Sequence, residues 1–210
     1  MTRKNYHHGD LKNALIQAGI EILAKEGIGG LSLRKAARKA GVSHSAPYAH
    51  FTDKQNLIAA IASDGHKKIY EQFETIRARH SDNPLRQFVA GAWAFVEFGL
   101  SSPDHYKITF SGAIQDEHSH SEFIEYSQRN MQILRDIVEQ CRSAGVLNNQ
   151  DIDSELQAVS IWGLLHGLVL LMIQGQVPGN LMKSVQPKDM LLAALQQVVR
   201  VPINKKMFNE

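Results

Sequence analysis

Residues 32–51 read Ser-Leu-Arg-Lys-Ala-Ala-Arg-Lys-Ala-Gly-Val-Ser-His-Ser-Ala-Pro-Tyr-Ala-His-Phe, and this stretch decides the fold of the N-terminal part of the chain. Four apolar residues in its first half recur at i, i+3, i+4 and i+7, the spacing of one helical face. They are Leu33, Ala36, Ala37 and Ala40. Gly41 follows at once, as the left-handed residue that ends a helix. A second, short helix ends at Phe51, with Ser43 or Ser45 able to cap it.

The remaining positions of the first helix are basic, namely Arg34, Lys35, Arg38 and Lys39. Two short helices, a turn of about three or four residues that contains Gly, and a basic exterior are typical of a DNA-reading helix-turn-helix. A helical hairpin with a solvated basic face would show the same spacing. The pattern therefore favours DNA binding and leaves the simpler interpretation open.

The residues that follow are more specific. Gly41-Val42-Ser43 precedes Ala-Pro-Tyr48-Ala-His50-Phe51-x-x-Lys54-x-x-Leu57, which resembles the helix-turn-helix of the TetR family of bacterial transcription regulators. The resemblance covers about residues 9–65. It implies that Tyr48, His50 and Lys54 meet DNA phosphates and that Phe51 is part of the core.

Two positions depart from the family pattern. Pro47 stands where many members have a branched aliphatic residue, and Ala49 stands where many carry a large polar or aromatic one. Because Ala49 has no polar atom, base reading is expected at the front of the second helix instead, with His44 having the best reach. The predicted DNA-binding residues are Ser32, Arg34, Ser43, His44, Ser45, Tyr48, His50 and Lys54.

Charge and composition agree with a local site for a polyanion. The 210 residues carry a net charge of +2, with 43% hydrophobic and 21% charged residues, as in ordinary soluble globular proteins. Residues 1–54 hold nine Lys and Arg against four Asp and Glu, a net +5, and the remainder is net −3. A basic quarter on a near-neutral body indicates one nucleic-acid surface and not a globally basic protein.

The chain is expected to be cytoplasmic and not to bind a membrane. Its N-terminus lacks the apolar core of a signal peptide. The longest apolar run, residues 159–173, is interrupted by Ser160 and His166 and is shorter than the roughly 20 residues that span a bilayer. A single cysteine, Cys141, excludes an intrachain disulfide and a cysteine-rich zinc site.

The apolar periodicity predicts an all-α fold in two parts. The first is a three-helix DNA-binding domain, residues 1–54, with the helix-turn-helix at about 32–51. The second is a helical domain for ligand binding and dimerisation, residues 55–210. Helices are expected at about 53–80, 84–101, 106–113, 122–143, 153–175 and 187–200.

The segment Trp162-Gly-Leu-Leu-His166-Gly167 resembles the signature of one TetR subgroup, named for its Trp, His and Gly. The family resemblance implies that the two last long helices of each subunit form a four-helix dimer interface. Residues 161–173 are also too apolar to face water, which independently favours a partner surface.

Aromatic side chains between residues 88 and 126, with two later residues, suggest a pocket for a mostly apolar or aromatic inducer. Its predicted lining is Trp93, Phe110, Phe123 and Trp162, with His166 as a polar anchor. Aromatic residues at helical spacing are more often plain core, and a His in an apolar helix more often bonds a carbonyl. Both interpretations stay open.

The loop at 116–122, Asp-Glu-His-Ser-His-Ser-Glu, offers imidazole and carboxylate groups that divalent metals accept. Such runs are usually solvated loops, and the chain has no nucleophile elbow, Gly-rich phosphate loop or paired carboxylates in helical register. We expect no catalytic residue, metal or cofactor. The sequence predicts a ligand-responsive repressor that binds a palindromic operator in double-stranded DNA as a homodimer. The alternatives are a metal-dependent helical enzyme and a non-specific architectural DNA binder.

Overall fold

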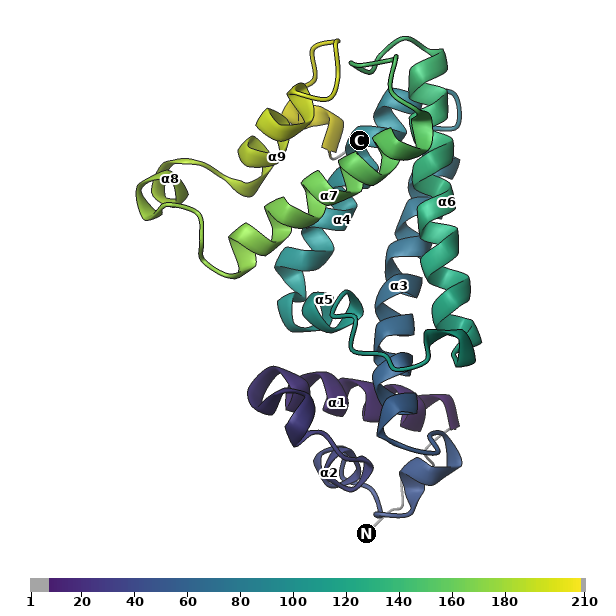
Figure 1. Cartoon of the computed structure of the whole chain (residues 1–210). Helices are drawn as coiled ribbons and strands as arrows, with labels where there is room; N and C mark the ends of the chain where they lie inside the picture. The colour runs from purple at the N-terminus through teal and green to yellow at the C-terminus, as the bar shows by residue number, and fades with distance from the viewer. Residues whose placement is uncertain (1–7, 209–210) are drawn as a thin grey trace. The chain divides into compact units, whose positions relative to one another are not determined.

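The structure is a computed structural model that describes residues 8–208, without the side chains of residues 8–10 and 182 (Figure 1). Within this range the chain is helical and forms no strand beyond a single bridge between Leu147 and Val199. The prediction of an all-α fold is confirmed. The helices are α1 (His8–Gly30), α2 (Leu33–Lys39), α3 (Lys54–Arg79), α4 (Pro84–Ser101), α5 (Pro103–Thr109), α6 (Ser121–Ser143), α7 (Ser154–Ile173), α8 (Gly179–Ser184) and α9 (Pro187–Gln196), with 3-10 turns η1 (Ala46–Ala49), η2 (Glu117–Ser119) and η3 (Lys205–Phe208).

The described chain divides into two compact units. The first combines the residues up to Lys67 with Asp104–Ser127, and the second combines Lys68–Pro103 with the residues from Gln128 onward. Helices α3 and α6 therefore each contribute residues to both units. The predicted boundary after residue 54 separates DNA binding from ligand binding and dimerisation, and it stays a prediction.

The core of the first unit joins α1, α2 and the first half of α3. Leu15 of α1, Ala36 of α2 and Leu57 of α3 are fully buried. A Cβ at Gly19 would lie 2.7 Å from Cδ1 of Ile61, so glycine at this position lets α1 and α3 approach closely. On the inner face of α1, Leu15, Ala18, Ile22 and Leu23 are buried, and Leu11 packs against the same core while partly exposed.

The second unit is built around α4. This helix packs against α7, α9 and η3, and most of its residues are buried. Its start is well defined, because Oδ1 of Asn83 accepts a hydrogen bond from the Arg86 amide at 3.0 Å and Pro84 occupies the first turn. Phe88, Val89 and Val96 fill its inner side.

The predicted helices agree with α3, α4, α6 and α7 to within about two residues at each end. The prediction for residues 106–113 was wrong, because α5 runs from Pro103 to Thr109. Pro103 is the first residue of α5, in agreement with the preference of proline for the first turn of a helix. The last helix, α9, ends at Gln196 and not at residue 200. Helix α8 and the turn η3 were not predicted.

Helix α7 is apolar on nearly every side, yet only one side is covered. Ile161, Leu165 and Val169 are buried, whereas the window of highest hydropathy, with a mean of 1.9, is only 33% buried. The helix has 20 residues, so by length and composition alone it could cross a membrane. The prediction that the apolar stretch around residues 159–173 is too short to span a bilayer is therefore wrong, because the helix that contains it is longer than the uninterrupted run.

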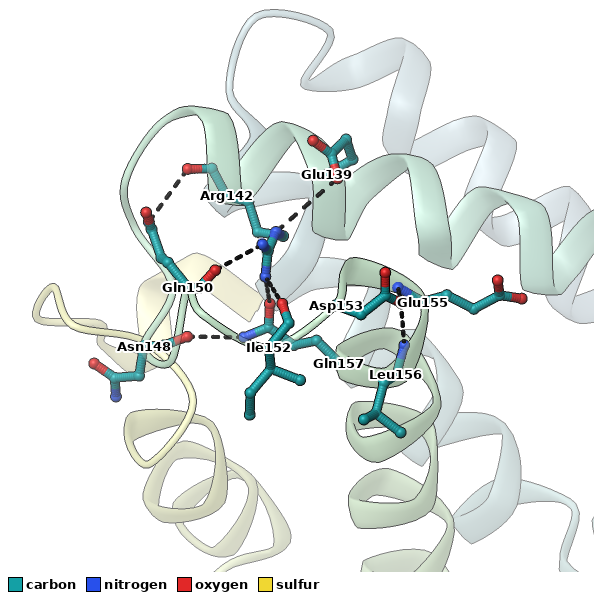
Figure 2. Close-up of polar contacts among 9 residues, drawn as sticks. All are labelled: Glu139, Arg142, Asn148, Gln150, Ile152, Asp153, Glu155, Leu156 and Gln157. Carbon is teal, nitrogen blue, oxygen red and sulfur yellow. Dashed lines mark hydrogen bonds and ion pairs between the residues drawn. The ribbon is translucent and has the colours of Figure 1, made fainter.

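Arg142 of α6 holds the loop that leads into α7 (Figure 2). Its Nη1 donates to the carbonyl of Ile152 at 2.7 Å and to Oε1 of Gln157 at 2.9 Å, and its Nη2 donates to the carbonyl of Gln150 at 2.8 Å. Nε2 of Gln157 in turn donates to the carbonyl of Asn148 at 2.8 Å. The guanidinium group spreads its N–H donors over a plane, so it reaches three acceptors that lie apart from one another.

We expect Arg142→Ala to lower the free energy of unfolding by about 2–3 kcal/mol, because three charge-assisted hydrogen bonds are lost in a half-buried setting. Arg142→Lys should fall between this variant and the wild type, since one ammonium cannot reach all three acceptors. The control is Glu139→Ala, whose Oε2 lies 4.0 Å from Nε of Arg142 and whose side chain is 61% exposed. Its effect should stay within about 0.5 kcal/mol in urea unfolding. Equal loss from Glu139→Ala and Arg142→Ala would contradict this.

Candidate nucleic-acid interface

The corner after α2 is set by Gly41, whose φ of 71° lies in the left-handed region. The Gly41 amide donates to the carbonyl of Arg38 at 3.3 Å, and the Val42 amide donates to the carbonyl of Ala37 at 3.0 Å. These two bonds satisfy carbonyls that the end of α2 would otherwise leave open. Val42 packs against the core of the first unit. The predicted helix end at Gly41 is confirmed.

The short second helix of the motif is a 3-10 turn and not an α-helix. The amides of Ala46 and Tyr48 donate to the carbonyls three residues earlier, at 3.1 and 3.2 Å. Pro47 is the cause. Because proline has no N–H, it cannot donate to the carbonyl of Ser43 four residues before it, and that carbonyl accepts from Ala46 instead.

The predicted cap by a serine side chain was wrong. Ser45 occupies the N-cap position, but its side chain makes no capping hydrogen bond. Its Oγ lies 3.2 Å from Oγ of Ser43. The two hydroxyls therefore bond each other at the surface and not the backbone of the turn.

We call residues 43–50 the reading turn. Ser43, His44 and Ser45 at its front are exposed, and 54% of Tyr48 is exposed. His50 is half-buried. Phe51 directly after the turn is only 3% exposed, so its predicted role in the core is confirmed. The turn therefore presents polar side chains at its front and is anchored by a buried aromatic residue directly after it, an arrangement suited to contact with another molecule.

Lys54 begins α3 immediately after the reading turn. Oδ1 of Asp53 accepts a hydrogen bond from the Asn56 amide at 2.9 Å, so Asp53 caps the start of this helix. A cation in the first turn is mildly disfavoured by the helix dipole. Lys54 is half-buried at this position, and an anion opposite it would offset that cost.

Two of the four cations of α2 form ion pairs with α1, and the other two do not. Lys35 forms an ion pair with Glu26 of α1, and Nζ of Lys39 lies 2.5 Å from Oε2 of Glu21, where Lys39 lowers the pKa of that carboxyl. Arg34 and Arg38, one helical turn apart, are exposed, and within residues 8–208 neither makes an ion pair. The two arginines are thus the cations of α2 that remain available to phosphates.

Ser32 and Arg38 complete this surface in different ways. Ser32 is the N-cap of α2, and its Oγ accepts from the Lys35 amide at 3.2 Å. Its oxygen is therefore already an acceptor within the protein, while its O–H can still donate to a phosphate. Arg38 was not among the predicted contacts, because the sequence shows four equivalent cations and cannot reveal that two of them pair with α1.

The predicted pocket residues lie in both units. In the first unit, the rings of Phe110 and Phe123 flank His66, with centroids 5.1 and 5.3 Å from its own. Burial lowers the pKa of His66 to about 4, so this imidazole is neutral at ordinary pH. The structure thus brings two of the five residues together around a third group that the sequence did not indicate.

In the second unit, the rings of Trp162 and His166 form a tilted pair with centroids 5.7 Å apart, and the His166 ring centroid lies 6.1 Å from that of Phe95. Burial lowers the pKa of His166. Trp93 instead meets the C-terminal part of the chain, with Phe208 at 6.0 Å between centroids and Nζ of Lys188 4.7 Å above its ring. A single pocket lined by all five residues stays a prediction.

Within the described residues, no three His, Cys, Asp or Glu side chains gather in a group that could hold a metal ion.

Comparison with known families decides where this arrangement belongs. Residues 15–61 match the bacterial regulatory proteins of the tetR family, and residues 88–198, more than half of the chain, match the C-terminal domain described as tetracyclin repressor-like. The chain belongs to the TetR family. The predicted family resemblance is confirmed, while the subgroup named for Trp, His and Gly stays a prediction.

Two curated relatives share parts of this TetR-family chain. The uncharacterized HTH-type transcriptional regulator YobS of Bacillus subtilis (strain 168) is 27% identical over 100 residues, which cover 47% of this chain and 51% of YobS. The tetracycline repressor protein class A from transposon 1721 of Escherichia coli is 32% identical over 79 residues, which cover 38% of this chain and 35% of that repressor. The matches thus span about half of the first relative and about a third of the second.

A solved structure of a protein with unknown function from Rhodococcus sp. RHA1 shares the fold along nearly the whole chain. It is 27% identical, with a TM-score of 0.73, and the match covers 92% of this chain and 96% of that one.

The split among the cations of α2 can be tested directly. We expect Arg38→Ala to weaken DNA binding on all sequences and to reduce the slope of log K against log salt by about one per subunit, as for the loss of one phosphate contact. Lys39→Ala is the matched control, since Lys39 is engaged with Glu21. Its slope should stay close to that of the wild type in fluorescence anisotropy titrations at several salt concentrations. Equal losses of slope would show that the ion pair does not withhold Lys39 from DNA.

Proposed function

We propose that the chain is a sequence-specific DNA-binding repressor of transcription that binds a palindromic operator as a homodimer and acts in the cytoplasm. The observation that carries this proposal is the reading turn. Its exposed Ser43, His44 and Ser45 stand at the front of a turn that Gly41 positions and Phe51 anchors. Two arginines of α2 without an ion pair lie in the same motif.

Positioning and reading fall to different residues of this surface. Tyr48, His50 and Lys54, together with Ser32 and Arg34, supply phosphate contacts that set register but carry no sequence information. Base edges in the major groove are left to the front of the reading turn. His44 is the longest polar side chain there, and one 3-10 turn offers no further exposed polar position before Tyr48.

Two copies are needed for this mode of recognition. A single short turn reaches few bases, and a two-fold pair of reading turns enters major grooves about one helical turn apart, roughly 34–36 Å. The apolar side of α7 that the chain leaves uncovered supports such pairing. Isologous pairing of identical subunits would make the operator a palindrome.

Selection of binding sites from random duplex DNA tests the function. We expect the wild type to select a two-fold symmetric sequence, and His44→Ala to change the base preferred at one position of each half-site, by roughly 1–3 kcal/mol of discrimination. Tyr48→Phe serves as the control, since loss of a phosphate contact should weaken binding without changing the selected bases. Selection of no common sequence by the wild type would favour a non-specific architectural binder.

We also propose that a mostly apolar or aromatic small molecule releases the repressor from its operator. The predicted walls are Phe110 and Phe123 in the first unit and Trp93 and Trp162 in the second, where His166 is the candidate polar anchor. The tilted pair of Trp162 and His166 forms an aromatic cluster in the second unit, and the edge contacts of Phe110 and Phe123 with His66 form another in the first. Such a ligand must prefer the state that cannot bind DNA, because equal affinity for both states shifts nothing.

Shortened aromatic residues separate a pocket from plain core. We expect Trp93→Leu and Phe123→Leu to fold, to bind the operator and to need at least tenfold more ligand for operator release. Phe88→Leu is the control, because Phe88 is 3% exposed and is no candidate for the pocket. It should lower the melting temperature and leave the ligand response unchanged. If every variant changes melting and ligand response in parallel, the aromatic residues are core and the pocket assignment fails.

A further inference from the structure

Each of the two lysines of α2 is held by a carboxylate of α1. Nζ of Lys39 lies 2.5 Å from Oε2 of Glu21, and Lys35 forms its ion pair with Glu26. Residues 1–54 contain only four acidic residues, so half of them are engaged with the lysines of this one short helix. Both pairs lie inside the first unit, next to the proposed DNA contacts.

Glu21 has a lysine of its own helix within reach and still pairs with α2. Lys25 follows Glu21 by four residues, which is the favoured order for an ion pair along one helix. The ion pair forms instead with Lys39, whose hydrogen bond and charge are the main causes that lower the pKa of the Glu21 carboxyl, while Lys25 contributes least. The carboxylate of Glu21 is therefore directed at α2 and not along α1.

Glu26 is seated by two glycines. Gly27, directly after it, has φ 65° and ψ −174°, which breaks the helical backbone of α1 at this point. A Cβ at Gly30 would lie 2.3 Å from Cβ and 2.8 Å from Oε2 of Glu26. Gly30 has no positive φ that would require glycine. Its missing side chain leaves the space in which the Glu26 carboxylate meets Lys35.

The stability of the first unit does not account for these two pairs. The four side chains are between 29% and 59% exposed, and exposed ion pairs contribute little to the free energy of unfolding. Helices α1 and α2 are already joined by a shared apolar core, to which Leu15, Leu33 and Ala36 belong. The pairs do, however, change which cations of α2 are available to another anion.

The lysines lie beside the arginines on α2. With 3.6 residues per turn, Arg34 and Arg38 share one side, and Lys35 and Lys39 share a second side about 100° further round, toward the buried Ala36. A lysine ammonium sits on a flexible four-carbon stem. An unpaired lysine at either position can therefore turn toward a polyanion that the two arginines contact.

We infer that the two glutamates withhold the lysines of α2 from DNA phosphates and thereby limit the strength of DNA binding and the range of salt concentration in which it occurs. The inference rests on DNA binding in the proposed function and concerns its strength, not its sequence. A lysine that leaves a carboxylate for a phosphate exchanges one anion for another, so it adds little to the release of counterions. The glutamates touch no DNA and act only through the lysines that they hold.

Neutral glutamine in place of either glutamate tests this inference. We expect Glu21→Gln and Glu26→Gln each to steepen the slope of log K against log salt by about one per subunit on duplex DNA of random sequence. Affinity at about 0.1 M salt should rise roughly fivefold to tenfold for each subunit bound, and should approach that of the wild type near about 1 M salt. Fluorescence anisotropy titrations measure both quantities. If the glutamates only hold α1 against α2, both variants bind DNA more weakly, which overturns the inference.

Two further variants show whether the gain passes through the lysine. Glu117→Gln is the charge-matched control, because Glu117 is an exposed residue of the first unit and forms no ion pair with α2. Its slope should equal that of the wild type, and an equal increase would overturn the inference in favour of a general charge effect. The double variant Glu21→Gln with Lys39→Ala should return to the wild-type slope. An increase that survives the loss of Lys39 would also overturn it.

The glycine at position 30 gives a test that leaves every charge in place. Gly30→Ala should displace the Glu26 carboxylate and steepen the slope as Glu26→Gln does, and the two changes together should be no steeper than Glu26→Gln alone. Melting curves identify a variant that does not fold, and Glu26→Gln then decides for this pair. A folded Gly30→Ala variant with the wild-type slope would overturn the role of Glu26.

The outcomes also separate this inference from the proposed function. A wild type that selects a palindrome, with glutamine variants that keep its slope, refutes the inference alone. A wild type that binds all sequences alike, with steeper slopes in the glutamine variants, refutes sequence-specific recognition and supports the inference. A wild type that binds no duplex DNA at any salt concentration refutes both.

Discussion

The left-handed backbone of Gly41 is the constraint on which the proposed DNA surface depends. With φ at 71°, the chain turns sharply after α2, and the amides of Gly41 and Val42 close the end of the helix. Val42 then enters the core of the first unit, and Phe51 does the same after the reading turn. The polar residues between these two anchors have no place in the core. Because Val42 and Phe51 anchor both ends of this segment in the core, the polar residues between them lie at the surface.

Much of this surface could be predicted from the sequence, because its devices are local. A glycine after an apolar helical face, an aspartate before Lys54 and an aromatic after a polar stretch each act within a few residues. Pro47 is a local signal that the sequence prediction did not use. Its missing N–H forbids the α-helical hydrogen bond to Ser43, but an ordinary short helix was predicted. The ion pairs of Lys35 and Lys39 with α1 could not be predicted in this way, because they depend on how two helices pack.

In the rest of the chain, the positions of the long helices could be predicted from the sequence, but what each helix packs against could not. The periodicity of α4, α6 and α7 indicated their extents, because long amphipathic or apolar segments leave little choice. Helix α8 and the turn η3 are too short to show a period, and η3 is held by Met207 and Phe208, which are buried. The all-round apolar character of α7 predicted burial on several sides. Among the described residues only one side of α7 is covered, and the proposed homodimer would cover more of it.

In the proposed function, DNA recognition therefore depends on dimerisation. A reading turn of a single 3-10 turn presents only a few polar side chains, too few for one copy to select a site among many. Doubling that turn through a fixed two-fold contact adds specificity without adding residues to either copy. The contact must be rigid, because the spacing of half-sites is only as well defined as the joint that sets it. Helix α3 begins with Lys54 directly after the reading turn and contributes residues to both units. It is therefore the element through which the proposed ligand would act on the proposed DNA contacts.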